Sequence, residues 1–191
     1  MSLPHIAEEI CLAMKMLYVK GLITPLAGNI SVRLDDRILV TPSAYLKYAL
    51  RPEDLVEVDM SGRVLRGGRP TSELPMHLEI YHVCRECRAV VHIHGIYAPM
   101  LRKNDVNELF IDAELEYVLK PRVCFIEIKP PGTRELAEAV ASSVSEGCNA
   151  VVLERHGVVT VGSNLRIALE LAEVIEIAAR RMFVSRCIEK K

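Results

Sequence analysis

The sequence predicts an α/β sandwich built around a mainly antiparallel sheet. Short apolar runs separated by turn residues follow one another closely enough to pair as β-hairpins. Between them lie segments whose apolar residues recur every three or four positions, as in amphipathic helices. Hairpin pairing favours an antiparallel sheet over the parallel sheet of a doubly wound fold. No repeat or flexible linker divides the 191 residues, so we expect a single domain over residues 1–191.

The first half of the chain opens with a helix and continues with hairpins. The helix is expected to stop at Gly21, because glycine commonly follows the last helical residue. Asp35 and Asp36 are expected to form the turn of the first hairpin. The elements expected here are a helix at 4–20, strands at 30–34, 37–41, 55–59 and 64–65, and a helix at 72–87.

The second half alternates helices with strongly apolar strands. Thr133 is expected to cap the helix that it precedes, because its hydroxyl can accept a hydrogen bond from the first turn. Residues 108–119 fit neither pattern. The elements expected here are a strand beginning at 89, a helix at 97–103, a strand at 123–128, a helix at 133–146, one strand from 150 through 161, and a helix at 164–188.

Charge and hydropathy argue against nucleic acid or a membrane as the main partner. The 24 basic and 25 acidic residues nearly cancel, and no long basic run is present. No apolar run approaches the roughly 20 residues that span a bilayer. Neither glycine-rich nucleotide-binding motif occurs. The N-terminus lacks the charged-then-apolar order of a secretory signal, so we expect a cytoplasmic protein.

The six cysteines are scattered through apolar segments, where thiols behave as small buried hydrophobic groups. A cytoplasmic protein is expected to keep them reduced. Cys84 and Cys87 form a CxxC motif, but no second such motif completes four zinc ligands. A disulfide stays open as an alternative if the source is a hyperthermophile, whose intracellular proteins are often disulfide-rich.

Three histidines are candidate metal ligands. His92 and His94 end an apolar strand that begins at Ala89, and residues two apart on a strand point to the same face. His156 follows a similar run that begins at Ala150. A catalytic zinc centre commonly has three protein ligands and one open position. We therefore expect these histidines to bind zinc, the alternative being ordinary hydrogen-bonded histidines at strand ends.

Glu73 lies at the expected start of a helix, beside Thr71 and Ser72, either of which could cap that helix. The simplest role for Glu73 is a favourable interaction with the helix dipole. A helix start also offers N–H groups and hydroxyls that suit a phosphate, and a carboxylate near a metal could act as a general base. His77 lies four residues on, on the same helical face, and is a rival metal ligand.

Two further polar turns are candidates for a binding site. Gly28 and Asn29 precede a strand, and Ser43 and Ala44 follow Thr41 at the end of another. If these residues have only a structural role, they form ordinary turns, and Asn29 makes a hydrogen bond to the nearby backbone. In the functional interpretation, Gly28 allows close backbone approach to a phosphate and Asn29 donates to one of its oxygens.

Together, these motifs resemble the class II (zinc-dependent) aldolase family, which includes L-fuculose-1-phosphate aldolase and L-ribulose-5-phosphate 4-epimerase. The motifs are specific for the family and less specific for the substrate. The resemblance covers roughly residues 5–185 and implies a three-layer α/β/α sandwich. It also implies a homotetramer whose active sites lie between neighbouring subunits. The motifs that carry it are Ala27–Ser31, Val40–Ser43, Thr71–Glu73, Val91–His94, Gly132–Arg134 and Arg155–Gly157.

The resemblance assigns roles to individual residues. His92, His94 and His156 match the zinc ligands, and Glu73 matches the catalytic acid/base. The positions that match the phosphate site are Gly28, Asn29, Ser43, Ala44, Thr71 and Ser72. The family often has glycine where Ala44 stands. Helix-terminal N–H groups and hydroxyls can hold the phosphate, so no lysine or arginine is required.

The implied activity is reversible, zinc-dependent cleavage of a ketose 1-phosphate to dihydroxyacetone phosphate and a short aldehyde such as L-lactaldehyde. Burial is expected to raise the pKa of Glu73. Alternatives that use the same histidines are a methylthioribulose-1-phosphate dehydratase and a ribulose-phosphate 4-epimerase. A non-catalytic domain resembling the adducin head is the alternative outside enzymes, and the retained histidines argue against it.

The chain departs from the family on the aldehyde side of the site. The family takes a tyrosine from a neighbouring subunit, in the segment that corresponds to residues 112–117. Ala113 stands at the gapless position, and Tyr117 is the nearest substitute. The family also closes the site with an aromatic residue in a C-terminal tail, whereas residues 186–191 contain no tyrosine.

Overall fold

The computed structural model describes residues 3–111, 113, 116–117 and 121–189. Its α-helices are α1 (Leu3–Val19), α2 (Leu74–Val83), α3 (Arg134–Ser145) and α4 (Leu165–Glu189). Its strands are β1 (Asn29–Leu34), β2 (Arg37–Val40), β3 (Val56–Asp59), β4 (Val64–Arg66), β5 (Ala89–Ile93), β6 (Val123–Ile126), β7 (Ala150–Leu153) and β8 (Gly157–Gly162). Short 3-10 helices are η1 (Lys47–Ala49), η2 (Pro52–Asp54), η3 (Ala98–Met100) and η4 (Lys103–Ile111).

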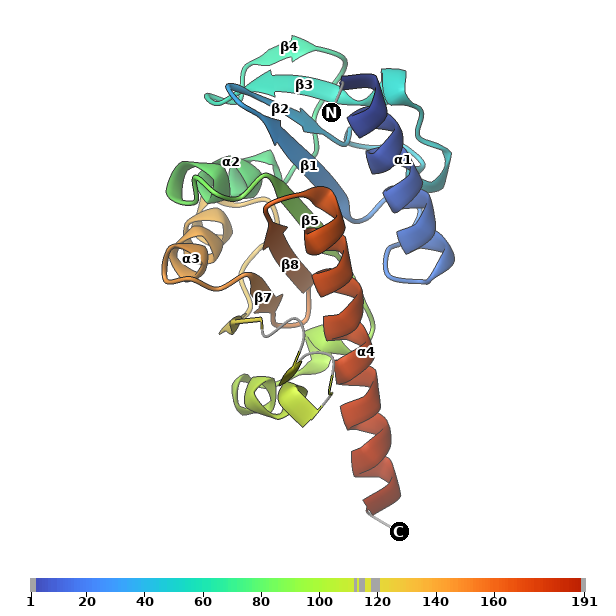
Figure 1. The fold of residues 1–191 in the computed structure, drawn as a ribbon, viewed down its shortest axis with the longest axis vertical. Coiled ribbons are helices and arrows are strands. Elements are labelled where there is room, and N and C mark those ends of the chain that lie inside the picture. The colour runs from blue at the N-terminus through green and yellow to red at the C-terminus, as the bar shows by residue number, and fades with distance from the viewer. Residues whose placement is uncertain (1–2, 112, 114–115, 118–120, 190–191) are drawn as a thin grey trace.

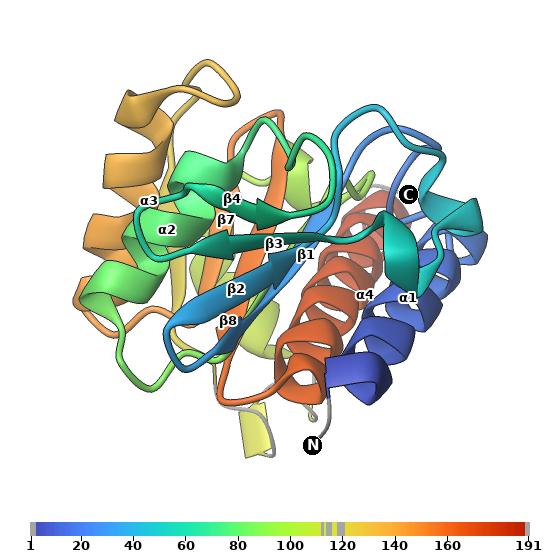
Figure 2. The same ribbon diagram turned by 90° about the horizontal axis from the view of Figure 1, so that it is seen from above.

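The strands of the described residues form one eight-stranded sheet in the order β4-β3-β2-β1-β5-β8-β7-β6. β6 and β7 are parallel, and the other neighbouring strands are antiparallel. Figure 2 shows α1 and α4 on one face of this sheet and α2 and α3 on the other. The predicted α/β/α sandwich around a mainly antiparallel sheet is therefore confirmed.

Each face of the sheet has its own hydrophobic core, because successive strand residues point to opposite faces. Along β5, Val91 and Ile93 pack with α1 and α4, whereas Val90 packs with α2 and α3. His92 follows the same alternation and shares the face of Val90. This places the His92 side chain toward the start of α2, where Glu73 lies.

Two expected elements are wrong. Residues 150–161 form the hairpin β7–β8 rather than one strand, and His156 lies in the turn that joins them. The helix expected at 97–103 is replaced by the single turn η3. The buried Glu176 carboxylate accepts N–H groups from Ile96, Tyr97 and Ala98, which fixes the chain in a tight turn instead of a longer helix.

The expectation of reduced cysteines is also wrong for four of the six. The structure pairs Cys84 with Cys87 and Cys124 with Cys148, while Cys11 and Cys187 are free. The Cα atoms of the pairs lie 5.4 and 6.0 Å apart, within the range that a disulfide spans. The CxxC motif thus links the end of α2 to the turn that follows, and the second pair joins β6 to the segment before β7.

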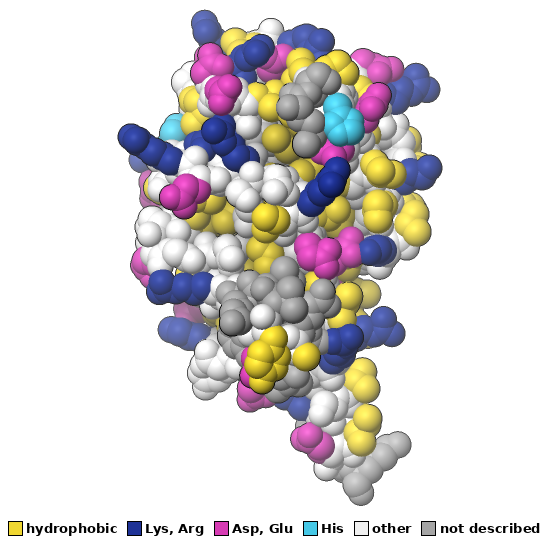
Figure 3. Space-filling model, in the orientation of Figure 1, with side chains coloured by type: hydrophobic (Ala, Val, Ile, Leu, Met, Phe, Trp, Pro, Cys, Tyr) yellow, Lys and Arg dark blue, Asp and Glu magenta, His cyan; other side chains and the backbone are white. Residues whose placement is uncertain are grey.

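The surface carries charges of both signs. Figure 3 shows basic and acidic side chains interspersed on one face, with hydrophobic side chains along the end of α4. Figure 1 shows this end of α4 extending beyond the sheet. Within the described ranges, no helix is both long and apolar enough to cross a membrane.

Candidate metal centre and active site

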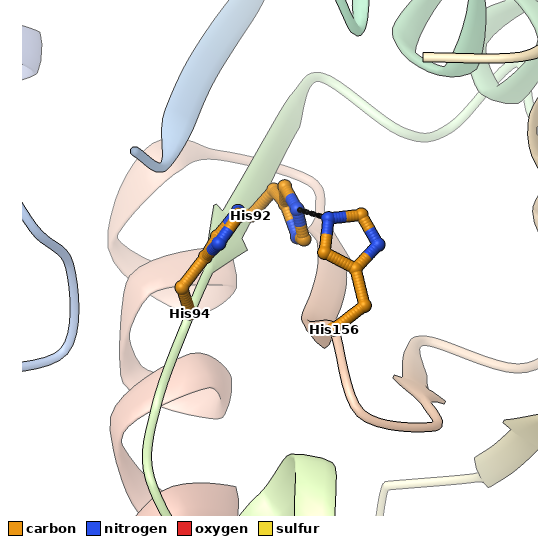
Figure 4. Close-up of side chains that lie close together, drawn as sticks. All are labelled: His92, His94 and His156. Carbon is orange, nitrogen blue, oxygen red and sulfur yellow. Dashed lines mark hydrogen bonds between the residues drawn. The ribbon is translucent and has the colours of Figure 1, made fainter. Parts of the chain in front are cut away.

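His92, His94 and His156 converge on one point, although they come from separate segments. Their candidate ligand atoms lie within 4.8 Å of one another. His92 lies on β5, His94 follows the end of that strand, and His156 lies in the β7–β8 turn. Figure 4 shows the three rings close together. Adjacent ring centroids are 4.6 to 4.9 Å apart, so the structure brings the three predicted ligands into one cluster.

Two glycines let the backbone come close enough to form this cluster. A side chain at Gly157 would overlap the carbonyl oxygen of Ile93 and press on the His92 ring, so the turn carrying His156 needs glycine here. Gly28 has φ +81°, and a side chain there would overlap Ile23 and lie 3.2 Å from the carbonyl oxygen of His92. Glycine at both positions therefore brings two loops against the end of β5.

The hydrogen bonds of His92 define which nitrogen faces the centre. Nδ1 lies 3.0 Å from the carbonyl oxygen of Val158, and because a carbonyl only accepts, Nδ1 is the donor. His92 Nε2 then faces the centre, 3.4 Å from His156 Nε2 and 3.0 Å from Glu73 Oε2. Three electron-rich atoms meeting in this way suit a divalent cation.

Protonation and burial also fit a metal centre. Burial lowers the pKa of His94 to about 3 and that of His156 to about 4, so both rings are neutral near pH 7, as metal ligands must be. His156 Nδ1 and Glu73 Oε2 are buried without a hydrogen-bond partner in the described part of the chain. The donor set therefore matches the three-histidine composition of catalytic zinc sites.

Glu73 occupies the cap position before α2, not the first turn where we expected it. Its side chain makes no capping hydrogen bond, because its carboxylate turns away from the helix toward the histidines. Oε1 accepts the N–H of Gly132 at 3.2 Å and lies 3.7 Å from His156 Nε2. The predicted helix-dipole role therefore does not account for the placement of this carboxylate.

The pKa of Glu73 is shifted in the opposite direction to the one expected. Burial raises the pKa, but the interactions of the carboxylate with the nearby His92, His156 and His77 rings lower it by more. The net pKa lies well below its ordinary value. Glu73 is therefore ionised at neutral pH.

A cavity of about 380 Å³ opens beside the cluster. Glu73, His94 and His156 line it, together with all the residues assigned to a phosphate by resemblance: Gly28, Asn29, Ser43, Ala44, Thr71 and Ser72. Two backbone hydrogen bonds hold the loops in place, from Thr71 N–H to Thr41 O and from Ser43 N–H to Arg69 O, each 3.0 Å. The three polar turns noted in the sequence, at residues 28–29, 43–44 and 71–72, thus line the same cavity.

His77 is not part of the histidine cluster. It is fully buried and lies between Asn29 Oδ1, 2.5 Å from Nε2, and Ser31 Oγ, 2.7 Å from Nδ1. Burial lowers the pKa of His77 to about 3, so the ring is neutral, with Nε2 donating to Asn29 and Nδ1 accepting from Ser31. Since the Asn29 oxygen is occupied, its amide N–H groups remain for the cavity. No sequence pattern signals these contacts, which join residues 46 and 48 positions apart.

Lys47 and Arg155 also line the cavity, although neither was predicted as a site residue from the sequence. Lys47 is only 2% exposed. A signal was available in the sequence, because Lys47 is the single charged residue between Tyr45 and Leu50.

None of the described positions in the segment 112–117 lines the cavity. Tyr117 is 69% exposed and does not line the cavity. Ala113 is also exposed. Positions 112, 114–115 and 118–120, which include much of the segment that the resemblance assigns to a neighbouring subunit, lie outside the described residues.

Residues 8–183 match the family model described as class II aldolase and adducin N-terminal domain, and the chain belongs to this family. One relative is an L-fuculose phosphate aldolase from Methanococcus vannielii, 35% identical over 92% of this chain and 94% of the relative. Another is a 3-oxo-tetronate 4-phosphate decarboxylase from Haemophilus influenzae, 36% identical over 87% of this chain and 81% of the relative.

A solved structure gives the same result. The L-fuculose-1-phosphate aldolase from Thermus thermophilus superposes with a TM-score of 0.82 at 29% identity, covering 97% of this chain and 96% of that one. The family inferred from the sequence motifs is therefore confirmed, and it indicates a lyase. Relatives of similar identity carry two different activities, so family membership alone leaves the substrate to be argued from the site.

Proposed function

We propose that this protein is a zinc-dependent aldolase that reversibly cleaves a ketose 1-phosphate similar to L-fuculose 1-phosphate. The products are dihydroxyacetone phosphate and a short aldehyde such as L-lactaldehyde. The observation that carries the proposal is the convergence of three histidines and an ionised Glu73 beside a polar cavity. The relatives named as L-fuculose phosphate aldolases support it.

His92, His94 and His156 would hold the zinc ion. When bound, zinc supplies Lewis-acid polarisation of the ketone and neighbouring hydroxyl oxygens of the substrate. Three protein ligands leave a coordination position open for substrate, in contrast to a structural site with four. The hydrogen bond from His92 Nδ1 to the Val158 carbonyl fixes the ring orientation and leaves Nε2 available as the ligand atom.

Glu73 would carry out the proton transfer. In synthesis, its carboxylate removes a proton from the hydroxymethyl carbon of dihydroxyacetone phosphate, and in cleavage it returns that proton. One oxygen is anchored by the Gly132 N–H, and the other is free of hydrogen bonds. The ionised state of Glu73 suits a group that must first accept a proton.

The phosphate would lie against the three polar turns. Ser43, Thr71 and Ser72 offer hydroxyls, and the amide of Asn29 is turned toward the cavity by His77. These groups, with the backbone at Gly28 and Ala44, hold an anion without reacting with it. The phosphate would thereby fix the substrate so that its carbonyl end reaches the histidines.

We also propose that the protein acts in the cytoplasm as a homotetramer with sites between neighbouring subunits. Exposed apolar residues on the projecting part of α4, including Val184 and Ile188, support an association surface there. Such a neighbour would contribute residues to the aldehyde side of the site. Sedimentation of the purified protein as a monomer would contradict this.

The direct test offers dihydroxyacetone phosphate with a panel of short aldehydes and follows product formation. We expect condensation with L-lactaldehyde, and no activity after the metal is removed with a chelator. Methylthioribulose 1-phosphate and ribulose 5-phosphate belong in the same panel. Water loss from the first, or epimerisation of the second, in the absence of aldol cleavage would replace this proposal. A folded protein that binds no metal and turns over nothing would indicate an adducin-like role.

The Glu73→Gln variant tests the proton transfer separately. It removes the charge of the carboxylate but keeps its size, so we expect the metal to stay bound. Exchange of the dihydroxyacetone phosphate proton with solvent should fall by at least about 100-fold, in line with the loss of general base catalysis. Proton NMR in deuterated water measures the exchange, and wild-type rates in this variant would remove Glu73 from the role.

A decarboxylase is the second candidate, because a relative of equal identity is named as one. A 3-oxo-tetronate 4-phosphate also carries a phosphate, and loss of its carboxylate breaks a carbon–carbon bond beside a ketone. Arg155, which lines the cavity, is suited to pair with such a carboxylate. Release of carbon dioxide from this compound, without condensation of any aldehyde, would favour the second candidate.

A further inference from the structure

Lys47 is a buried cation in the cavity described above. It begins η1, and its side chain is almost wholly inaccessible to solvent. Its Nζ donates a hydrogen bond to the carbonyl oxygen of Pro42, in the turn that leads to Ser43. No carboxylate among the described residues forms an ion pair with Lys47 or offsets the effect of burial on its charge.

A buried ammonium without a counter-ion is unfavourable, because it loses its hydration and gains little in return. Burial lowers the pKa of Lys47 to about 8. An ammonium has three N–H donors, and the Pro42 carbonyl takes one, which leaves donors available for a ligand. An apolar side chain of similar length would fill this place at lower cost, so packing alone does not account for a lysine here.

The neighbours of Lys47 point to an anion as the missing partner. Asn29, Ser43, Thr71 and Ser72 line the same cavity and contribute neutral donors. The other charged or titratable groups that line it are Glu73, His94, Arg155 and His156. Of these, Glu73 accepts the N–H of Gly132 and lies 3.0 Å from His92 Nε2. The cavity therefore holds positive charge that its one carboxylate does not neutralise.

We propose that Lys47 binds the phosphate group of the substrate and makes this site select phosphorylated over unphosphorylated ketoses. The identity of the ketose rests on the proposed function, whereas the binding of a phosphate by Lys47 does not. Hydrogen bonds from a charged donor are about twice as strong as neutral ones, so Lys47 adds attraction that the hydroxyls cannot. It is a binding residue and takes no part in the proton transfer.

The test measures binding of inorganic phosphate by calorimetry, first to the protein as purified and then to the chelator-treated protein. Lys47→Met should weaken phosphate binding by about 10- to 100-fold, the effect of losing one charge-assisted hydrogen bond. Lys47→Gln keeps a donor for Pro42 but lacks the charge, and it should show the same loss. Lys129→Met is the matched control, because Lys129 pairs with Glu135 outside the cavity; its affinity should stay within about twofold.

Wild-type affinity in Lys47→Gln would overturn the proposal, as would the absence of phosphate binding in the wild type. Phosphate binding that disappears on chelation would also overturn it, because the anion would then sit on the metal. A structural role predicts a lower melting temperature for Lys47→Met, whereas an anion site predicts an equal or higher one. If phosphate binds through Lys47 but no ketose phosphate is cleaved, this inference stands and the proposed function fails.

Discussion

At the scale of single residues, the site depends on which atoms of its histidines are occupied by protein partners. His92 gives its Nδ1 proton to the backbone and keeps Nε2 for the centre. His77 uses both nitrogens, one for Asn29 and one for Ser31, and so has none left for a metal. Two buried histidines on one face of the sheet thus differ in whether a ring nitrogen is left without a protein hydrogen bond.

A pair of variants separates these histidines. His156→Ala should remove most of the bound metal, because two ligands rarely hold zinc firmly. His77→Leu should leave the metal in place and raise the KM for the phosphorylated ketose, because Asn29 is no longer oriented. It should also lower the free energy of unfolding by about 1–3 kcal/mol, the cost of buried polar groups left without partners. Metal analysis and steady-state kinetics check both, and loss of metal in His77→Leu would make His77 a ligand after all.

Lys47 also predicts how stability depends on pH. Its folded-state pKa is about 8, below the ordinary value of 10.5. Between these values the unfolded chain holds a proton that the folded chain has lost, so stability rises as pH increases from about 8 to 10.5. The penalty from the buried charge is fully present below pH 8 and amounts to about 3 kcal/mol.

Comparing the free energy of unfolding of the wild type with that of Lys47→Met isolates the contribution of Lys47. The other titratable groups contribute equally to both proteins and cancel in the difference. We expect the variant to be more stable than the wild type near neutral pH and the gap to close as the pH approaches the ordinary lysine pKa. Urea unfolding at several pH values measures the gap. A constant difference across this range would mean that Lys47 does not titrate as a buried cation.

At the scale of elements, the turns were harder to predict than the helices and strands. The hairpin β1–β2 was predicted because Asp35 and Asp36 are typical turn residues. The hairpin β7–β8 was missed because its turn, Glu154–His156, contains no glycine, proline or asparagine. Arg155 in this turn has φ 56°, in the left-handed region that residues other than glycine and asparagine seldom adopt. The turn is followed by Gly157, whose backbone lies close to the carbonyl oxygen of Ile93 in β5. Sequence periodicity does not detect such a contact.

The Thr41–Ala44 turn allows a test at this scale. Ala44 has φ 59°, in the left-handed region where glycine is favoured. Ala44→Gly should therefore raise the free energy of unfolding by about 0.5–1 kcal/mol. Ala49→Gly, in η1, is the control and should lower it by a similar amount, since its backbone is not left-handed. Equal destabilisation of both variants in urea unfolding would contradict this conformation of Ala44.

At the scale of the whole molecule, sheet order explains why distant motifs meet. β1, β5 and β8 are neighbours, so Asn29 pairs with His92 in the register, and His92 pairs with Val159. The β7–β8 turn and the loop before α2 both contribute residues to the cavity. The motifs predicted the components of the site, because each is local in sequence. The His77 contacts and the Cys124–Cys148 disulfide join segments that are distant in sequence, which local patterns do not encode.

The central claim is that the three histidine rings hold one metal ion beside Glu73. Crystals of the purified protein, measured on both sides of the zinc absorption edge, test it most directly. The account predicts a single anomalous peak per chain between His92, His94 and His156, present above the edge and weak below it. An empty cluster in crystals grown with zinc, or an ion held elsewhere by other side chains, would contradict it.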